Sequence, residues 1–171
     1  NPTDSFNSMY RIYNYIQYKR VEINGVEMNL HYHPHRLHNL HIEQSYSFLN
    51  TTNKDDAYGL ALIPANSIKT KLLLDISEYE NLTKYKVEDL SLYHIHKFQQ
   101  NSFAEHEEMT ESYNVINLKV RGRFNKRMEY SFLINNLLNE EYTPHISRLR
   151  GVAGGVPNPG RSFGFNLRYE F

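Results

Sequence analysis

The chain has 171 residues, of which 40% are hydrophobic, and its 19 basic residues balance its 19 acidic ones. The mean hydropathy is −0.66, and no apolar run approaches the ~18 residues that a transmembrane helix requires, which excludes a helix-spanning membrane protein. The balanced charge, without a basic block, disfavours nucleic acid as a partner. The sequence contains no Cys, which removes disulfide and thiolate chemistry.

Alternation of apolar and polar residues predicts about eight β-strands along the chain. The predicted strands are Met9–Tyr18, Val21–Tyr32, Leu40–Leu49, Ser67–Ile76, Glu88–Phe98, Tyr113–Phe124, Arg127–Leu137 and Arg161–Phe171. Glu88–Phe98 has the weakest alternation: Leu90 and Leu92 share a parity with His94 and His96. A β-bulge within this strand, or another register, would restore the pattern.

The last predicted strand is the most informative one. Its aromatic and aliphatic residues fall on one face and its polar and charged residues on the other, without a slip. A strand with lipid on one side and a wet lumen on the other has this pattern. The apolar residues are Phe163, Phe165, Leu167, Tyr169 and Phe171.

Charged residues on the alternate face of several strands also indicate a strand with lipid on one side and water on the other. They are Lys69, Lys71, Lys119, Arg121 and Arg123, with Glu27, Glu43 and Glu129. Such a row is costly in a soluble core and tolerable in a hydrated lumen. The 14 Tyr and 9 Phe suit the boundary between lipid and water. The sequence therefore predicts an all-β protein, an antiparallel transmembrane β-barrel.

The strand Leu167-Arg-Tyr169-Glu-Phe171 resembles the C-terminal assembly signal of bacterial outer-membrane barrels, which implies that this end of the strand faces the periplasm. Short connections then fall on the periplasmic side (33–39, 77–87 and 125–126), and longer ones fall outside (50–66, 99–112 and 138–160). This asymmetry is typical of outer-membrane barrels.

Further motifs resemble the end of a TonB-dependent outer-membrane receptor. The stretch Asn135-Asn-Leu-Leu-Asn-Glu-Glu-Tyr142, then Pro144-His-Ile-Ser-Arg-Leu149 and Pro159-Gly-Arg-Ser-Phe163, is similar to that family's last loop and strand. Gly25-Val-Glu27 and Ile63-Pro64 resemble two of its upstream strand entries.

The resemblance implies more than these residues contain. It implies a barrel of ~22 strands, of which these would be the last eight, and an N-terminal plug domain and TonB-contacting segment that are absent here. We therefore expect residues 1–171 to be the C-terminal segment of a larger receptor in the bacterial outer membrane. No signal peptide precedes Asn1-Pro2, which fits a mature protein or a fragment.

The function that the resemblance implies is TonB-dependent uptake of a scarce nutrient, such as a metal chelate, a siderophore or haem. The partners it implies are outer-membrane lipid, the plug and remaining strands, the TonB complex and the barrel assembly machinery. No cofactor is expected. The alternative of a complete eight-stranded barrel, acting as an anchor or in adhesion, stays open, and it predicts that Met9–Tyr18 pairs with Arg161–Phe171.

Candidate ligand-binding residues lie in the predicted external loops. Carboxylates and imidazoles on flexible loops bind divalent cations, and an Arg fork matches the carboxylates of an anionic chelate. The candidates are Glu105, His106, Glu107, Glu108, His145 and Arg148.

The histidines His31, His33, His35, His38 and His41 invite a metal interpretation, because imidazoles at i and i+2 on a strand share a face. Pro34 and the predicted periplasmic position favour solvated turn histidines instead, so no metal site is predicted there.

An enzyme is not expected, because no catalytic constellation emerges. A lipid-modifying enzyme remains the alternative of another class. It would need a Ser–His contact near the outer rim, where the in-strand histidines are His94 and His96, and their parity predicts that they face lipid.

Overall fold

The computed structural model describes residues 20–55, 57–77, 86–105, 107–150 and 155–171 with their side chains, and the backbone alone of Pro2–Asn7 and Tyr10–Tyr13. No helix in these ranges is long and apolar enough to cross a membrane.

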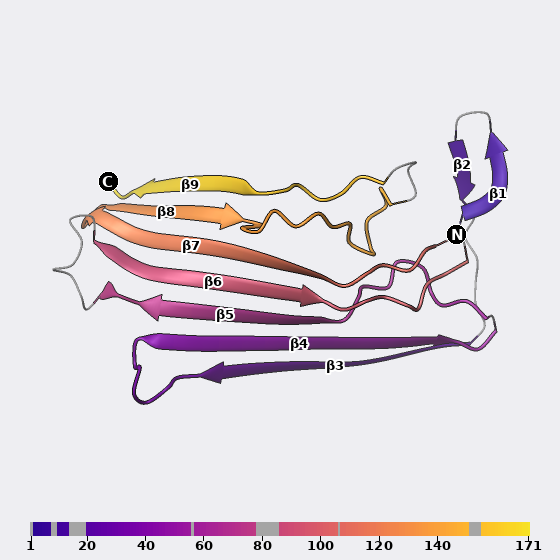
Figure 1. Ribbon diagram of the computed structural model, residues 1–171, viewed down its shortest axis with the longest axis horizontal. Coiled ribbons are helices and arrows are strands. Elements are labelled where there is room, and N and C mark those ends of the chain that lie inside the picture. Colours follow the sequence, from indigo (N-terminus) through magenta and orange to yellow (C-terminus); the bar gives the residue numbers. More distant parts are fainter. Residues whose placement is uncertain are drawn as a thin grey trace.

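Seven strands form one antiparallel sheet in which each strand pairs with the next along the chain (Figure 1). They are β3 (Val21–Tyr32), β4 (Leu40–Asn53), β5 (Ser67–Asp75), β6 (Val87–Lys97), β7 (Tyr113–Asn125), β8 (Met128–Asn135) and β9 (Ser162–Tyr169). At one end, which we call the short-turn end, the strands are connected through 33–39, 76–86 and 126–127, of which 78–85 lie outside the described residues. The first loop (54–66), the second loop (98–112) and the third loop (136–161) lie at the other, the loop end.

The register gives the sheet one apolar and one polar face, because side chains alternate along each strand and directly paired residues share a face. One continuous set of partners runs Leu72–Leu92–Leu118–Ile134–Phe163 across five strands. The opposite face carries the charged residues, with Glu43 beside Lys71 and Arg123 beside Glu129. The alternation predicted from the sequence is thus confirmed for these strands.

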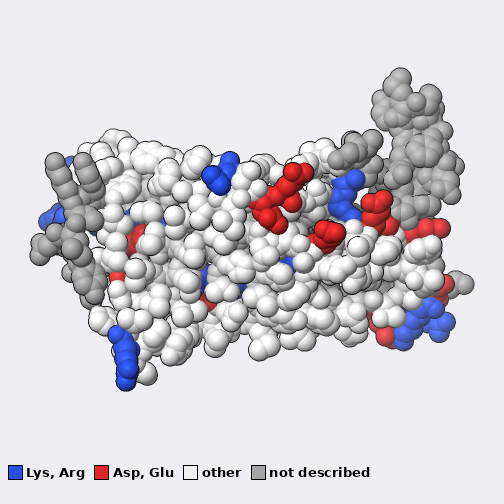
Figure 2. Space-filling model, in the orientation of Figure 1, with Lys and Arg blue, Asp and Glu red and all other residues white. Residues whose placement is uncertain are grey.

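The apolar face is uncovered. Among the described residues the buried hydrophobic ones are Ala104 and Val115, whereas Met28 is 64% exposed and Phe163 66%. Over the strands, most of the surface in Figure 2 carries no charged side chain, and the acidic side chains on this view gather toward the loop end, at the right. Soluble monomers rarely expose so large an apolar surface, but a transmembrane strand requires it.

The sheet is open in the described residues, with β3 and β9 at its edges. The expectation that Met9–Tyr18 is one of the barrel strands is wrong for its described part. Tyr10–Tyr13 (β2) pairs with Pro2–Asn7 (β1) in a separate two-stranded sheet, and not with β9. Alternation alone does not distinguish a strand of the main sheet from one arm of a local hairpin. Residues 14–19 lie outside the described part.

Two further details differ from the prediction. β4 continues to Asn53 and pairs with the whole of β3. The irregularity in β6 lies between Val87 and Asp89, near the start of the strand, so the parity of His94 and His96 stands without repair.

Candidate functional site

The three loops form a connected layer at the loop end. The backbone N–H of Gly59 in the first loop donates to the Phe103 carbonyl in the second at 2.9 Å. Gln100 Nε2 donates to the Ile63 carbonyl at 3.1 Å. These bonds between segments about 40 residues apart hold the loops as one body, where side chains of different loops meet.

Glu107 joins the first and second loops with both of its carboxylate oxygens. Oε1 accepts from the Leu62 N–H at 3.1 Å, and Oε2 accepts from the Ala104 N–H at 3.0 Å. The Leu62 backbone has a φ of 56°, a region that branched and bulky residues rarely adopt. Glu107 therefore stabilises the loop backbone.

His145, in the third loop, is the buried imidazole of the layer, with 3% of its surface exposed. Its Nδ1 lies 2.8 Å from Thr110 Oγ1 and 2.9 Å from Arg150 Nη1. A guanidinium only donates, so Nδ1 accepts and the ring carries its proton on Nε2. Burial lowers the pKa of His145, the Arg150 charge lowers it further, and Glu107, 3.8 Å from Nε2, opposes this by raising it.

Arg150 completes the layer. Besides His145 Nδ1, its guanidinium donates to the carbonyls of His145 at 3.1 Å and of Glu108 at 2.5 Å. Sequence reasoning missed Arg150 and selected Arg148, which is exposed. Both arginines lie in the same loop, and no local pattern indicates which one turns inward.

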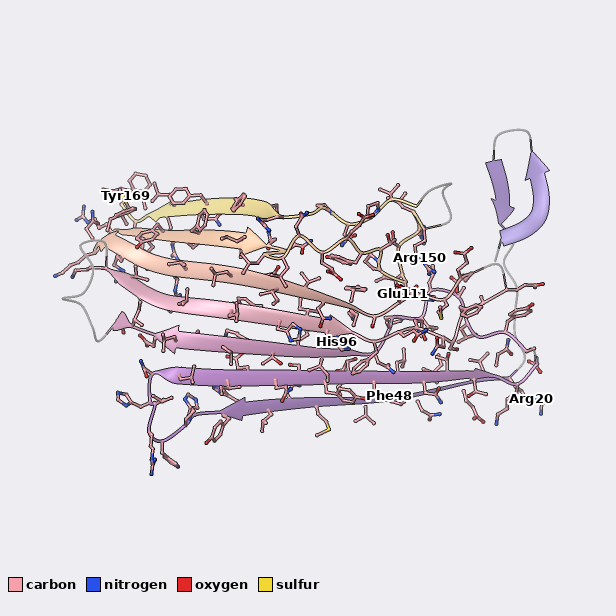
Figure 3. All side chains as sticks on the ribbon, viewed as in Figure 1. Arg20, Phe48, His96, Glu111, Arg150 and Tyr169 are labelled. Atoms are coloured by element: carbon pink, nitrogen blue, oxygen red, sulfur yellow. The ribbon has the colours of Figure 1, made fainter. Side chains whose placement is uncertain are left out.

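The predicted candidates thus divide into two groups. Glu107 and His145 come together inside the layer, with a carboxylate oxygen and a ring nitrogen 3.8 Å apart. Glu105, Glu108 and Arg148 have exposed side chains. His106 lies outside the described residues. In Figure 3, Arg150 and Glu111 both lie at the loop end, whereas Tyr169 of β9 lies at the opposite end of the sheet.

The base of the third loop is built from the motif that includes Asn136 and Asn139. Both have positive φ angles, 50° and 58°, which Asn tolerates better than most residues. Asn136 is buried, and its side chain bonds the backbone of Glu140 as donor and as acceptor, each at 2.8 Å. These contacts give the motif a structural role at the rim.

The polar face of the sheet is lined by ion pairs. Lys71 Nζ lies 2.9 Å from Glu43, and Arg121 lies 2.6 Å from Asp89. Arg123 bridges Glu88 at 3.2 Å and Glu129 at 2.9 Å. The predicted row of charges is therefore gathered on one face, and the acids Glu88 and Asp89 belong to it as well.

Within the part of the chain that the structure describes, no serine is recorded in contact with the in-strand histidines His94 and His96. His94 and His96 both contact Asn114 Oδ1, at 3.0 and 2.9 Å, on the apolar face. Ser91 has the opposite parity in β6, beside Lys119 and Leu73. Ser91 and His94 therefore lie on different faces of the sheet.

Comparison with solved structures finds a similar fold in an outer-membrane transporter. The copper transporter OprC matches with a TM-score of 0.75 and 20% sequence identity, over 88% of this chain and 24% of its own. At that identity the likeness establishes the fold: the seven-stranded sheet is the wall of an outer-membrane-type β-barrel. No protein-family model and no curated protein matches the sequence.

Proposed function

We propose that this chain is the C-terminal part of the barrel of a TonB-dependent receptor, which takes up a metal ion or metal chelate across the bacterial outer membrane. The observation that carries the proposal is an open sheet with one apolar and one charged face. An unpaired strand edge is not tolerated in lipid. Further strands are therefore needed to pair with β3 and β9.

The likeness to the copper transporter supports the class of cargo and the size of the assembly. This chain corresponds to 24% of that chain, which fits a receptor whose other strands, plug domain and TonB-contacting segment are contributed by further sequence. The charged row on the polar face would then meet the plug across the lumen. Leu167, Tyr169 and Phe171 would serve as the assembly signal read by the barrel assembly machinery.

The loop layer is the proposed place of ligand contact. The exposed side chains of Glu105, Glu108 and Arg148 can approach a ligand from outside. His106, which lies outside the described residues, stays a candidate from the sequence. Glu107 and His145, with Arg150, hold the loops in place for them. Carboxylate and imidazole ligands suit a divalent cation, and an exposed guanidinium suits the carboxylates of a chelate.

Uptake of isotopically labelled copper by cells that carry the full-length protein tests this function. We expect copper to accumulate above the level in cells that lack the protein. This accumulation should be lost when the proton-motive force is dissipated, because TonB-dependent transport draws its energy from the proton-motive force across the inner membrane. Uptake that persists without the proton-motive force, or no uptake of free or chelated copper, would contradict the proposal.

The intact mass of the native protein that carries this sequence tests the proposed architecture separately. A mass several-fold above 20.3 kDa, or a larger second chain that co-purifies, is expected. A native protein of 20.3 kDa alone would contradict the receptor.

A further inference from the structure

Three imidazoles meet at the short-turn end of β3 and β4, at the opposite end of the sheet from the loop layer. They belong to His31 in β3, His33 just beyond it and His41 in β4. The His33 ring lies 4.3 Å from that of His31 and 4.1 Å from that of His41, between centroids. One ring nitrogen of each residue lies within 4.8 Å of the others.

The strand register explains this meeting. His31 and His33 are two residues apart in an extended chain, so they share a face. The last pair of the β3–β4 ladder is Tyr32 with Ile42, and one step further His33 comes opposite His41. The face is the polar one, since His31 is paired with Glu43.

Glu43, the residue paired with His31 in the ladder, lies 2.9 Å from Lys71 Nζ. The side chains of His31 and His33 are exposed, so a ligand can reach the cluster from solvent.

We propose that His31, His33 and His41 bind one divalent transition-metal ion, with Cu²⁺ held more tightly than Ni²⁺ or Zn²⁺. Imidazole is a preferred ligand of all three ions, and affinity for them follows this order. Metal–nitrogen bonds of about 2.0–2.1 Å require ligand nitrogens about 3.3 Å apart. Rotation of the exposed His31 and His33 side chains brings the nitrogens to that separation, and the remaining coordination positions are left to water.

This site goes beyond the transport function and does not depend on it, because its ligands lie at the short-turn end of β3 and β4 and not in the loop layer. The sequence alone argued against it, because Pro34 and the predicted periplasmic position favoured solvated turn histidines. His31 and His41 lie in strands, as predicted, and the strand register brings His33 close to both of them.

The test is a titration of the full-length protein, purified in detergent and stripped with a chelator, with Cu²⁺. Bound copper is measured by calorimetry, and its nitrogen ligands are identified from the electron paramagnetic resonance spectrum. We expect His33→Ala to remove one bound equivalent or to weaken it at least about tenfold, since even the loss of a group that only orients a metal ligand costs 10–100-fold. His41→Ala should have the same effect.

His35→Ala is the matched control, because His35 is an exposed histidine of the same turn that lies outside the cluster. It should retain the affinity and the spectrum of the unmodified protein. His33 lies outside the strands, so its substitution leaves the ladder intact, which circular dichroism verifies. An unchanged titration for folded His33→Ala, or an equal loss for His35→Ala, would overturn the proposal.

Discussion

The side-chain oxygen of Asn139 accepts a hydrogen bond from the backbone N–H of Arg161 at 2.9 Å. This bond closes the third loop at its base, where the chain leaves β8 and enters β9. The same oxygen lies 2.6 Å from the position that a Cβ on Gly160 would occupy. Asn139, Gly160 and Arg161 thus form a clasp that accounts physically for two separate parts of the receptor-like motif.

The clasp predicts that Asn139→Ala destabilises the folded barrel by about 1.5–3.5 kcal/mol. The substitution removes one hydrogen bond, worth about 0.5–1.5 kcal/mol. It also replaces Asn, which tolerates the left-handed backbone at a φ of 58°, with Ala, for which that conformation costs about 1–2 kcal/mol. Urea unfolding of the protein in lipid vesicles measures the change. Asn139→Gly should reduce the free energy of unfolding by less, because Gly adopts the left-handed backbone without strain. Leu138→Ala, at a neighbouring position that is 62% exposed, should be near neutral.

A second prediction concerns the coupling of Gly160 to Asn139. Gly160→Ala alone should be destabilising, because its methyl group meets an oxygen that the Arg161 N–H holds in place. In an Asn139→Gly background the same substitution should cost little, since the obstructing oxygen is gone. A double-mutant cycle measures this coupling. Additive effects would show that the two residues do not interact.

The loop layer should loosen as the pH falls below about 6.5, the ordinary pKa of a histidine. The pKa of His145 is lowered in the closed layer. His145 therefore binds a proton more readily when the loops are open than when they are closed. Stability is then constant above this pH and decreases down to the lowered pKa of the closed form. Protonation at Nδ1 would also set a cationic ring against Arg150.

Amide hydrogen exchange of the second and third loops at pH 7.5 and pH 5.5, corrected for the intrinsic pH dependence of exchange, measures this effect. The unmodified protein should open more at the lower pH, and His145→Gln should show a much smaller difference. The same pH dependence in both proteins would assign it to another group.

Substitutions of Arg150 and Arg148 should have different effects: the first should affect the structure of the loops, and the second should affect ligand binding. Arg150→Ala should destabilise the layer by about 1–3 kcal/mol, because charged hydrogen bonds to Glu108 and His145 are lost. Arg148→Ala should leave the loops closed, and should weaken ligand binding if Arg148 contacts an anionic chelate. Limited proteolysis of the loops, alongside a binding titration with ferric citrate or a copper chelate, distinguishes the two. Equal protease sensitivity of both variants would contradict the assignment.

Much of the strand pattern could be predicted, because lipid and water on opposite faces force period-two alternation. Val21–Tyr32 was predicted to the residue. The extension of β4 through Asn50–Asn53 was missed because these residues are polar, although they pair with Val21–Asn24. Toward the loop end a strand needs its ladder bonds but no longer an apolar face, so hydropathy gives no signal there.

The candidate site was less predictable. Composition pointed to the loops and to Glu107 and His145, but Arg150 was missed, because its partner Glu108 lies 42 residues away. Local patterns do not encode such contacts between loops. The grouping of His31, His33 and His41 was also not predicted, because it depends on the register between two strands.

The central claim is that the apolar face of this sheet contacts lipid and the other face an aqueous lumen. Single cysteines placed along β9 in the full-length protein, carrying a spin label in lipid vesicles, test it directly. Collision with oxygen should exceed collision with a water-soluble nickel chelate at Phe163, Phe165 and Leu167, and the preference should reverse at Gly164 and Asn166. Uniform accessibility along the strand, or the opposite phase, would contradict the account.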